Sequence, residues 1–161
     1  MKTLLGQLKK AYPDITFSEG TVFSWSSQQQ TVYYVAQIES TQGVWSLLHE
    51  LGHATLQHTN YENDFALLQM EVAAWEQAKQ LAHEFGHAID EDHIQDCLDT
   101  YRDWLHQRST CPTCGNVSLQ QDARTYQCFN CGSEWTVSAT RHCRAYRKRL
   151  EPESRDLTLQ A

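Results

Sequence analysis

The 161-residue sequence lacks an apolar run long enough to span a bilayer, so we expect no membrane-spanning segment. Its first ten residues are amphipathic, and their apolar stretch is too broken for a signal peptide. Repeats and low-complexity segments are also lacking, and the 40% of hydrophobic residues argues against disorder of the whole chain. We therefore expect a cytoplasmic protein with a folded core.

Basic residues are scarce in the first part of the chain. Residues 1–100 carry 4 basic and 14 acidic side chains, whereas residues 101–161 carry 9 basic and 6 acidic ones. The change of sign coincides with the paired cysteines and predicts a boundary near residues 107–110. The predicted parts of the chain are a domain over 1–108, a second over 109–150 and a flexible tail over 151–161.

Two kinds of pattern predict the secondary structure. Apolar residues at helical spacing predict four helices, which cover 2–11, 44–54, 65–85 and 91–106. Runs of β-branched and aromatic residues predict short strands over 21–25, 31–36, 124–128 and 134–137. This order predicts an α+β fold, in which a short antiparallel sheet precedes the longer helices.

The sequence contains the motif His-Glu-x-x-His twice, beginning at His49 and at His83. Two histidines four residues apart share one face of a helix and can bind one zinc ion, while the glutamate can accept a proton from its bound water. Only the first copy follows a predicted pair of strands, as in zincins, whose edge strand binds extended peptide. We therefore predict that His49 and His53 bind a catalytic zinc and that Glu50 is the general base.

The second copy is better interpreted as the exposed end of a helix. His83, His87 and His93 have the three-histidine spacing of metzincins, but Asp90 occupies the position where that family has a turn-forming glycine. Both methionines of the chain precede this copy, so the methionine turn of that family is missing as well. Gly86 is expected to end the helix here.

A third ligand for the catalytic zinc is expected on the next predicted helix. Glu71 shares a helix face with Ala74 and Ala78, and such small residues would let this helix approach the motif helix closely. His58, five residues after His53, is the rival third ligand. Tyr61, Tyr101 and the same His58 are candidates for stabilising an oxyanion, and nothing in the sequence ranks them.

The motif at His49, followed by Glu71 with alanines three and seven residues later, resembles the ImmA/IrrE-type (minigluzincin-like) metallopeptidases over about residues 20–85. The resemblance implies a zinc-dependent endopeptidase that cleaves a regulatory protein such as a repressor. It assigns both motif histidines and Glu71 to the zinc ion, and Glu50 to the role of general base. Thermolysin-like enzymes have Asp four residues after the ligand glutamate, where this chain has Trp75.

Four of the six cysteines form two Cys-x-x-Cys pairs, separated by 13 residues. Without a secretion signal, such pairs are typical of metal ligands rather than of disulfides. Four thiolates close a tetrahedral zinc site and leave no position for a substrate, and the segment resembles a zinc ribbon. Its zinc would be structural, because so small a segment cannot fold alone. The predicted ligands are Cys111, Cys114, Cys128 and Cys131.

A cluster of basic residues follows the second Cys pair. If helical, this segment gives a surface of the kind that binds phosphates, and the alternative is a solvated helix packed on the ribbon. The residues are Arg141, Arg144, Arg147, Lys148 and Arg149.

The sequence thus predicts a small zincin-like domain followed by a zinc ribbon, with one catalytic and one structural zinc ion. The expected partners are a protein or peptide substrate and, through the ribbon, nucleic acid or protein. Two alternatives stay open. One resembles the SprT-like proteases, which act on DNA-bound proteins and use a third histidine. His58 as the third ligand would favour this alternative, whereas Glu71 would favour the ImmA/IrrE type. The other is a non-catalytic zinc-binding regulator.

Overall fold

A computed structural model describes residues 2–36, 40–139, 141 and 145–150. The chain divides into two compact units, Met1–Thr100 and Tyr101–Ala161. The predicted flexible tail over 151–161 and the predicted basic residue Arg144 lie outside the described residues. No helix in the described part of the chain combines the length and the apolar character needed to cross a bilayer.

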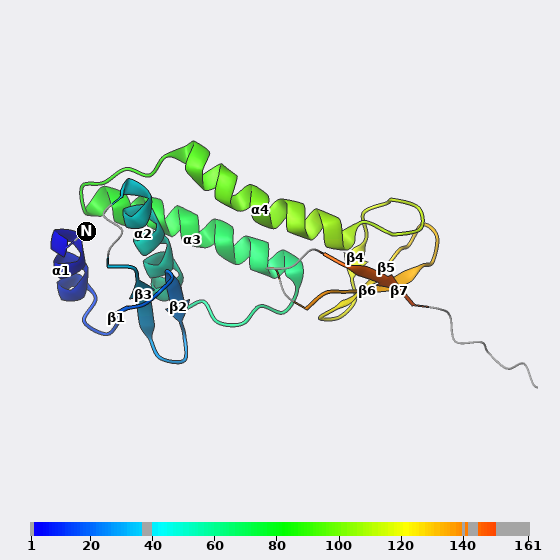
Figure 1. Cartoon of the computed structure of the whole chain (residues 1–161), viewed down its shortest axis with the longest axis horizontal. Coiled ribbons are helices and arrows are strands. Elements are labelled where there is room, and N and C mark those ends of the chain that lie inside the picture. Colours follow the sequence, from blue (N-terminus) through cyan, green and yellow to red (C-terminus); the bar gives the residue numbers. More distant parts are fainter. Residues whose placement is uncertain (1, 37–39, 140, 142–144, 151–161) are drawn as a thin grey trace, which may run out of the picture. The chain divides into compact units, whose positions relative to one another are not determined.

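All four predicted helices are present, and a small sheet lies between the first two in sequence (Figure 1). The first unit consists of α1 (Lys2–Ala11), β1 (Thr16–Glu19), β2 (Ser24–Ser26), β3 (Thr31–Tyr34), α2 (Thr41–Thr55) and α3 (Asp64–Glu84). The helix α4 (Glu91–Ser109) begins in this unit and ends in the second one. The α+β class is confirmed.

The sheet of the first unit has three strands in the order β1-β3-β2 and is mixed. β2 pairs antiparallel with β3, with Trp25 opposite Val32, and corresponds to the predicted hairpin. β1 pairs parallel with β3 and is absent from the predicted strands, because only Phe17 of its four residues is buried and the sequence there shows no alternation. β2 begins three residues later than predicted, and at its start Ser24 pairs with Tyr33.

Helices α2 and α3 are both capped by side chains at their N-termini and pack closely together. The side chains of Ser40 and Asn63 accept hydrogen bonds from backbone amides of the first turns. The close approach expected from Ala74 is found at Gly52, where an added Cβ would lie 2.5 Å from the carbonyl oxygen of Ala74. The backbone of α3 thus passes directly over the motif helix.

The second unit contains a four-stranded antiparallel sheet in the order β4-β5-β6-β7, consistent with a zinc ribbon. Its strands are β4 (Leu119–Gln120), β5 (Thr125–Gln127), β6 (Glu134–Val137) and β7 (Arg147–Arg149). Trp135 is fully buried and donates from Nε1 to the carbonyl oxygen of Arg108 over 2.9 Å. The remaining buried residues of this small core are Cys111, Tyr126, Cys128 and Val137.

The helical interpretation of the basic segment is wrong for residues 147–149. This stretch forms β7, in which Arg147 lies opposite Val137 and Arg149 lies opposite Trp135 of β6. Pairing with a neighbouring strand satisfies backbone groups that a short isolated helix would leave exposed, and the sequence alone gives no sign of that partner.

Candidate metal centres

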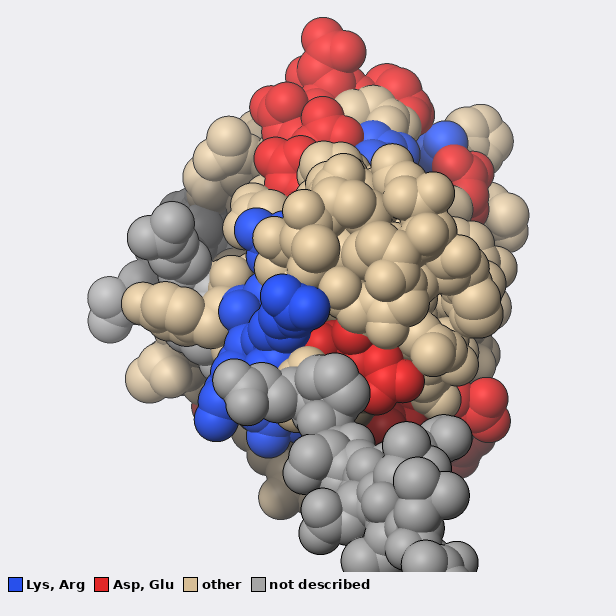
Figure 2. Space-filling view, turned by 90° about the vertical axis from the view of Figure 1, so that its right-hand side faces the viewer, with Lys and Arg blue, Asp and Glu red and all other residues tan. Residues whose placement is uncertain are grey.

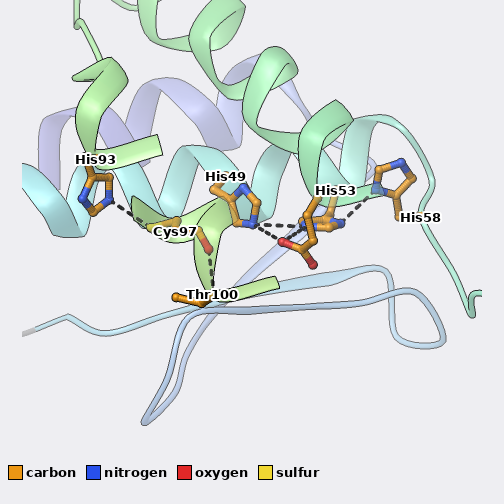
Figure 3. Close-up of polar contacts among 7 residues, drawn as sticks. His49, His53, His58, His93, Cys97 and Thr100 are labelled. Atoms are coloured by element: carbon orange, nitrogen blue, oxygen red, sulfur yellow. Dashed lines mark hydrogen bonds and ion pairs between the residues drawn. The ribbon is translucent and has the colours of Figure 1, made fainter. Parts of the chain in front are cut away.

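The first group of metal-binding side chains comes from two neighbouring helices. His49 and His53 lie one turn apart on α2, and Glu71 faces them from α3. Figure 3 shows both imidazoles turned toward one carboxylate. The Oε2 atom of Glu71 lies 3.2 Å from Nε2 of His49 and 3.7 Å from Nε2 of His53, and the two Nε2 atoms are 3.2 Å apart.

These separations fit a shared zinc ion. Ligand atoms about 2.0–2.1 Å from one zinc lie roughly 3.3 Å apart when the geometry is tetrahedral. His49 and Glu71 are buried, and buried polar groups of this kind need a partner to offset their lost hydration. Two imidazoles and one carboxylate are a donor set that suits zinc and leaves a fourth coordination position open.

Glu71 is the anionic member of this group. Burial opposes ionisation of its carboxyl group, but hydrogen bonds from His49 and His53 outweigh that effect and hold the pKa of Glu71 well below its usual range. The carboxylate is therefore ionised at neutral pH, the form in which it can bind a cation.

Glu50 lies between the two histidines in sequence and is half-buried. Burial raises the pKa of its carboxyl group, and the negative charge of Glu71 raises it further. The two histidines and a hydrogen bond from the backbone N–H of Trp25 act in the opposite direction without cancelling the shift. A carboxylate with a raised pKa is better suited to accept and return a proton near neutral pH.

His58 lies beside His53 rather than at the shared position of the ligand atoms. Its Nδ1 atom is 2.9 Å from Nδ1 of His53, on the side of that ring opposite Nε2. His58 does not belong to the metal-binding group found among the described residues. The structure therefore brings Glu71, and not the rival His58, to the two Nε2 atoms.

His49 is supported by an aromatic ring. The indole of Trp75 stacks on its imidazole, with ring centroids 4.2 Å apart and planes inclined by 26°. The Nδ1 atom of His49 is buried and has no hydrogen-bond partner among the described residues. Trp75 thus occupies the position where thermolysin-like enzymes have a carboxylate, and it supplies a stacking surface instead of an acceptor.

The second His-Glu-x-x-His copy forms no metal-binding group with other described residues. His83 and His87 are exposed at the end of α3, where Gly86 has a φ of 76°. His93 lies apart from them, with its ring between those of Trp45 and Trp75 and its Nε2 atom 3.7 Å from Sγ of Cys97. The interpretation of this copy as a helix end agrees with these positions.

The second group of metal-binding side chains consists of the four cysteines of the two Cys-x-x-Cys pairs. Sγ of Cys111 is 3.6 Å from that of Cys131, and Sγ of Cys114 is 3.5 Å from that of Cys128. Sulfur atoms about 2.3 Å from one zinc ion lie roughly 3.8 Å apart in a tetrahedron, so the cluster fits a closed Cys₄ site.

The cysteines of the two turns differ in acidity. Hydrogen bonds from Asn116 and Asn130 lower the pKa of Cys114, but burial and the neighbouring thiols of Cys128 and Cys131 outweigh them and raise it to about 11. Gly115 and Gly132, which follow the second cysteine of each pair, have φ values of 77° and 73°, a left-handed conformation that glycine adopts readily. A hydrogen bond from Ser118, together with backbone amides of the second turn, lowers the pKa of Cys128 to about 6. Thiolate is the form that binds metal.

Basic side chains gather on the second unit, and Figure 2 shows Lys and Arg side chains side by side. Arg147, Lys148 and Arg149 of β7 are all exposed, although Arg147 donates to the carbonyl oxygen of Thr110 over 2.7 Å. Tyr146, which precedes the strand, is 67% exposed. Three positive charges adjacent in sequence and an aromatic ring are therefore accessible, with Arg147 and Arg149 on one face of the strand and Lys148 on the other.

No protein-family model, curated protein or solved structure matches this chain. What the molecule can do chemically follows from its two metal-binding groups. One is an open His/His/Glu group of the kind found at His-Glu-x-x-His sites, and the other is a closed Cys₄ cluster.

Sequence reasoning misses the residues that surround the open group. The spacing presents His58 as a possible ligand but not as a neighbour of His53, and it presents Trp75 only as a departure from a known pattern. Trp25, whose backbone N–H bonds Glu50, gives no signal, because its position depends on the pairing of β2 with β3.

Proposed function

We propose that this chain is a zinc-dependent endopeptidase of the gluzincin type, which cleaves peptide bonds in a regulatory protein. The observation that carries the proposal is the convergence of His49, His53 and Glu71 on one position, with Glu50 next to it. The presence of Glu71 in this set favours the gluzincin type over the three-histidine set of the SprT-like alternative.

The two metal-binding groups support different roles. The Cys₄ cluster offers four donors and fills a tetrahedron, so it suits a structural ion. The His/His/Glu group offers three donors, and the carboxylate of Glu50, which is not one of these ligands, lies beside them. Three protein ligands with an open position and an adjacent base are typical of catalytic zinc sites.

Zinc, when bound, supplies a Lewis acid that polarises a carbonyl group and lowers the pKa of water to about 7. Glu50 then takes a proton from the attacking water at its carboxylate and gives it to the leaving amine. Its raised pKa suits both transfers, since a weaker acid is a better base.

The edge strand β2 supports an extended peptide as the substrate. β2 is one of the two outer strands in the order β1-β3-β2, and it is the one whose backbone, at Trp25, acts on Glu50. An extended chain can add to such an edge through main-chain hydrogen bonds, and these bonds do not depend on the side chains of the peptide. A scissile bond held there would lie close to the base.

The test is to incubate the zinc-loaded full chain with a proteome-derived peptide library and to read new termini by mass spectrometry. We expect cleavage by the wild type and a loss of about 10²–10⁴-fold in Glu50→Gln, with both zinc ions retained. Glu84→Gln, the same change in the second motif copy, is the control and should cleave like the wild type. Wild type that carries both zinc ions and cuts nothing, or equal cleavage by Glu50→Gln, would contradict the proposal.

A second function is favoured by one observation on the second unit. The exposed charges of Arg147, Lys148 and Arg149, next to the exposed ring of Tyr146, suit the phosphates and bases of a single-stranded nucleic acid. The ribbon would then bring the peptidase to a nucleic acid on which its substrate is bound.

This second function can be tested with a fluorescent 20-nucleotide single strand and the full zinc-loaded chain. The double change Lys148→Glu with Arg149→Glu should weaken binding at least tenfold. In a plot of the logarithm of affinity against the logarithm of salt concentration, the slope should also become less steep by about 0.7 for each phosphate that is no longer neutralised. The control pair Lys9→Glu with Lys10→Glu changes equally exposed charges of α1. Equal weakening in the two pairs, or unchanged binding in both, would rule out β7 as the binding surface.

A further inference from the structure

The chain turns back on itself directly after the motif helix. α2 ends at Thr55, and Gln57 has a φ of 53°, the left-handed conformation that reverses the chain direction after many helices. The backbone N–H of His58 then donates to the carbonyl oxygen of His53 over 3.0 Å. This turn brings the ring of His58 back against the last turn of the helix, as Figure 3 shows.

The two imidazoles meet through the same ring atom. Nδ1 of His58 lies 2.9 Å from Nδ1 of His53, and the ring centroids are 4.9 Å apart. One of these nitrogen atoms must donate and the other accept. Nε2 of His53 faces Glu71, and a neutral imidazole that binds metal through Nε2 carries its proton on Nδ1. With a metal ion on Nε2, His53 is therefore the donor of this hydrogen bond, and His58 is the acceptor.

His58 is itself fixed from the opposite side. The indole Nε1–H of Trp25 donates to the carbonyl oxygen of His58 over 2.8 Å and joins the turn to strand β2. His58 is half-buried and has hydrogen bonds through its backbone N–H, its carbonyl oxygen and its ring. Three bonds to two different elements leave the ring little freedom to move away from His53.

We infer that His58 is a positioning residue of the metal site, which fixes the orientation and the tautomer of His53 so that Nε2 is presented to the metal. The inference rests on the proposed function, because it takes His53 as a ligand. Metal-binding histidines commonly donate their second N–H to a fixed acceptor, and loss of that acceptor weakens metal binding about 10–100-fold.

The structure differs at the other ligand histidine, for which the described residues offer no equivalent acceptor. His49 stacks on Trp75, and its Nδ1 atom lacks a hydrogen-bond partner among the residues that the structure describes. A stacked ring can still slide or rotate in its plane, whereas a hydrogen bond selects one nitrogen. Of the two ligand histidines, His53 is therefore the one whose tautomer a described hydrogen bond can fix.

The experiment measures zinc affinity of the full chain by competition with a chromophoric chelator. His58→Phe keeps a ring but removes the acceptor, and we expect the His/His/Glu group to bind zinc 10–100-fold more weakly. His58→Asn keeps an acceptor oxygen and should stay within about threefold of the wild type, well short of that loss. His83→Phe, an exposed histidine at the end of α3, is the control. The Cys₄ zinc serves as an internal reference in every variant.

A second readout separates positioning from a general loss of structure. Nitrogen-15 NMR of the zinc-loaded wild type should show the His53 proton on Nδ1, and His58→Phe should shift or broaden that signal. If the phenyl ring prevents folding, His58→Ala replaces it with the same expectation. Zinc affinity within threefold of the wild type in these variants, with the His53 tautomer unchanged, would overturn the inference.

His49→Ala, measured in parallel, distinguishes this failure from failure of the proposed function. If His49→Ala keeps both zinc ions, the His/His/Glu group is not a metal site and both ideas fail. If His49→Ala loses one zinc ion while the His58 variants bind normally, only the positioning role is wrong.

Discussion

Three histidines of the first unit lie close together, but only two of them face the metal-binding position. His49 and His53 present Nε2 to Glu71, whereas His58 contacts the far side of His53 through Nδ1. Spacing along the helix explains the first two, since residues one turn apart share a face. Helix spacing does not explain the position of His58. That position depends on the left-handed backbone conformation of Gln57 and on the hydrogen bond from the Trp25 indole to the carbonyl oxygen of His58.

Replacement of Glu71 by glutamine tests the electrostatics of the site in the metal-free protein. The pKa of Glu71 is lowered on folding, so its contribution is fully present above its unfolded value, about 4.3, and is lost as the pH falls through the lower folded value. Hydrogen bonds to a charged group contribute about 1.5–3 kcal/mol. Urea unfolding should therefore show that Glu71→Gln has a free energy of unfolding lower than the wild type by that amount at pH 7. The difference between the two proteins should become smaller as the pH falls below about 4.3.

The matched control for this change is Glu76→Gln, on the same helix but exposed and paired only with Lys79 among its described ion-pair partners. An exposed pair of this kind contributes little, so its unfolding free energy should stay within about 0.5 kcal/mol of the wild type. A pH-independent difference for Glu71→Gln would show that the glutamine disturbs packing rather than charge.

At the level of elements, the close approach of α2 and α3 places ligands from both helices at one point. Gly52 and Ala74 form the contact, and Gly52 is flanked in sequence by the ligand His53. A larger residue at position 52 would push α3, and Glu71 with it, away from the two histidines. The absence of a side chain at Gly52 is therefore a requirement of the metal-binding geometry.

Gly52→Ala should separate the two helices. The new methyl group would lie 2.5 Å from the carbonyl oxygen of Ala74, and a backbone atom cannot move aside as a flexible side chain can. Overpacking of this kind costs about 1–3 kcal/mol. We expect a thermal midpoint lower by at least about 4 °C, and weaker zinc binding at the His/His/Glu group but not at the Cys₄ cluster.

Gly6→Ala is the control for helix propensity, because Gly6 lies in α1 with no heavy atom within 4 Å of an added Cβ. It should be neutral or more stable by about 0.5–1 kcal/mol, since alanine is the better helix former. If Gly52→Ala behaves in the same way, the contact with Ala74 does not limit the approach of the helices.

The sequence predicts helices better than strands, for a physical reason that β1 and β7 illustrate. Helix hydrogen bonds are local, so apolar spacing with caps such as Asn63 and a terminator such as Gly86 suffices to place α3. β1 and β7 are stabilised by partners elsewhere in the chain, and β7 consists of three exposed basic residues. The ligands that share a helix are predictable, whereas Trp25 reaches Glu50 only through strand pairing.

At the level of the whole molecule, the two units differ in how much they depend on metal. The first unit has a core that contains Leu8, Val32 and Leu47, all fully buried, in addition to its metal-binding group. Among the described residues of the second unit, the core has five members, and two of them, Cys111 and Cys128, belong to its metal-binding group. Removal of zinc therefore takes away much of what stabilises the second unit.

Selective loss of each zinc ion should accordingly have unequal effects on folding. The wild type should bind two zinc ions, and His49→Ala and Cys114→Ser should each bind one, as measured by elemental analysis. Cys114→Ser should open the second unit, so that chymotrypsin cleaves after the buried Tyr126 and Trp135, which are only 1% and 0% exposed in the folded chain. His49→Ala should leave both of these sites protected, because its change falls on the unit with the larger core. A ribbon that loses its zinc and still resists cleavage at Trp135 would show that the four-stranded sheet folds without metal, and the structural role of the Cys₄ site would then be wrong.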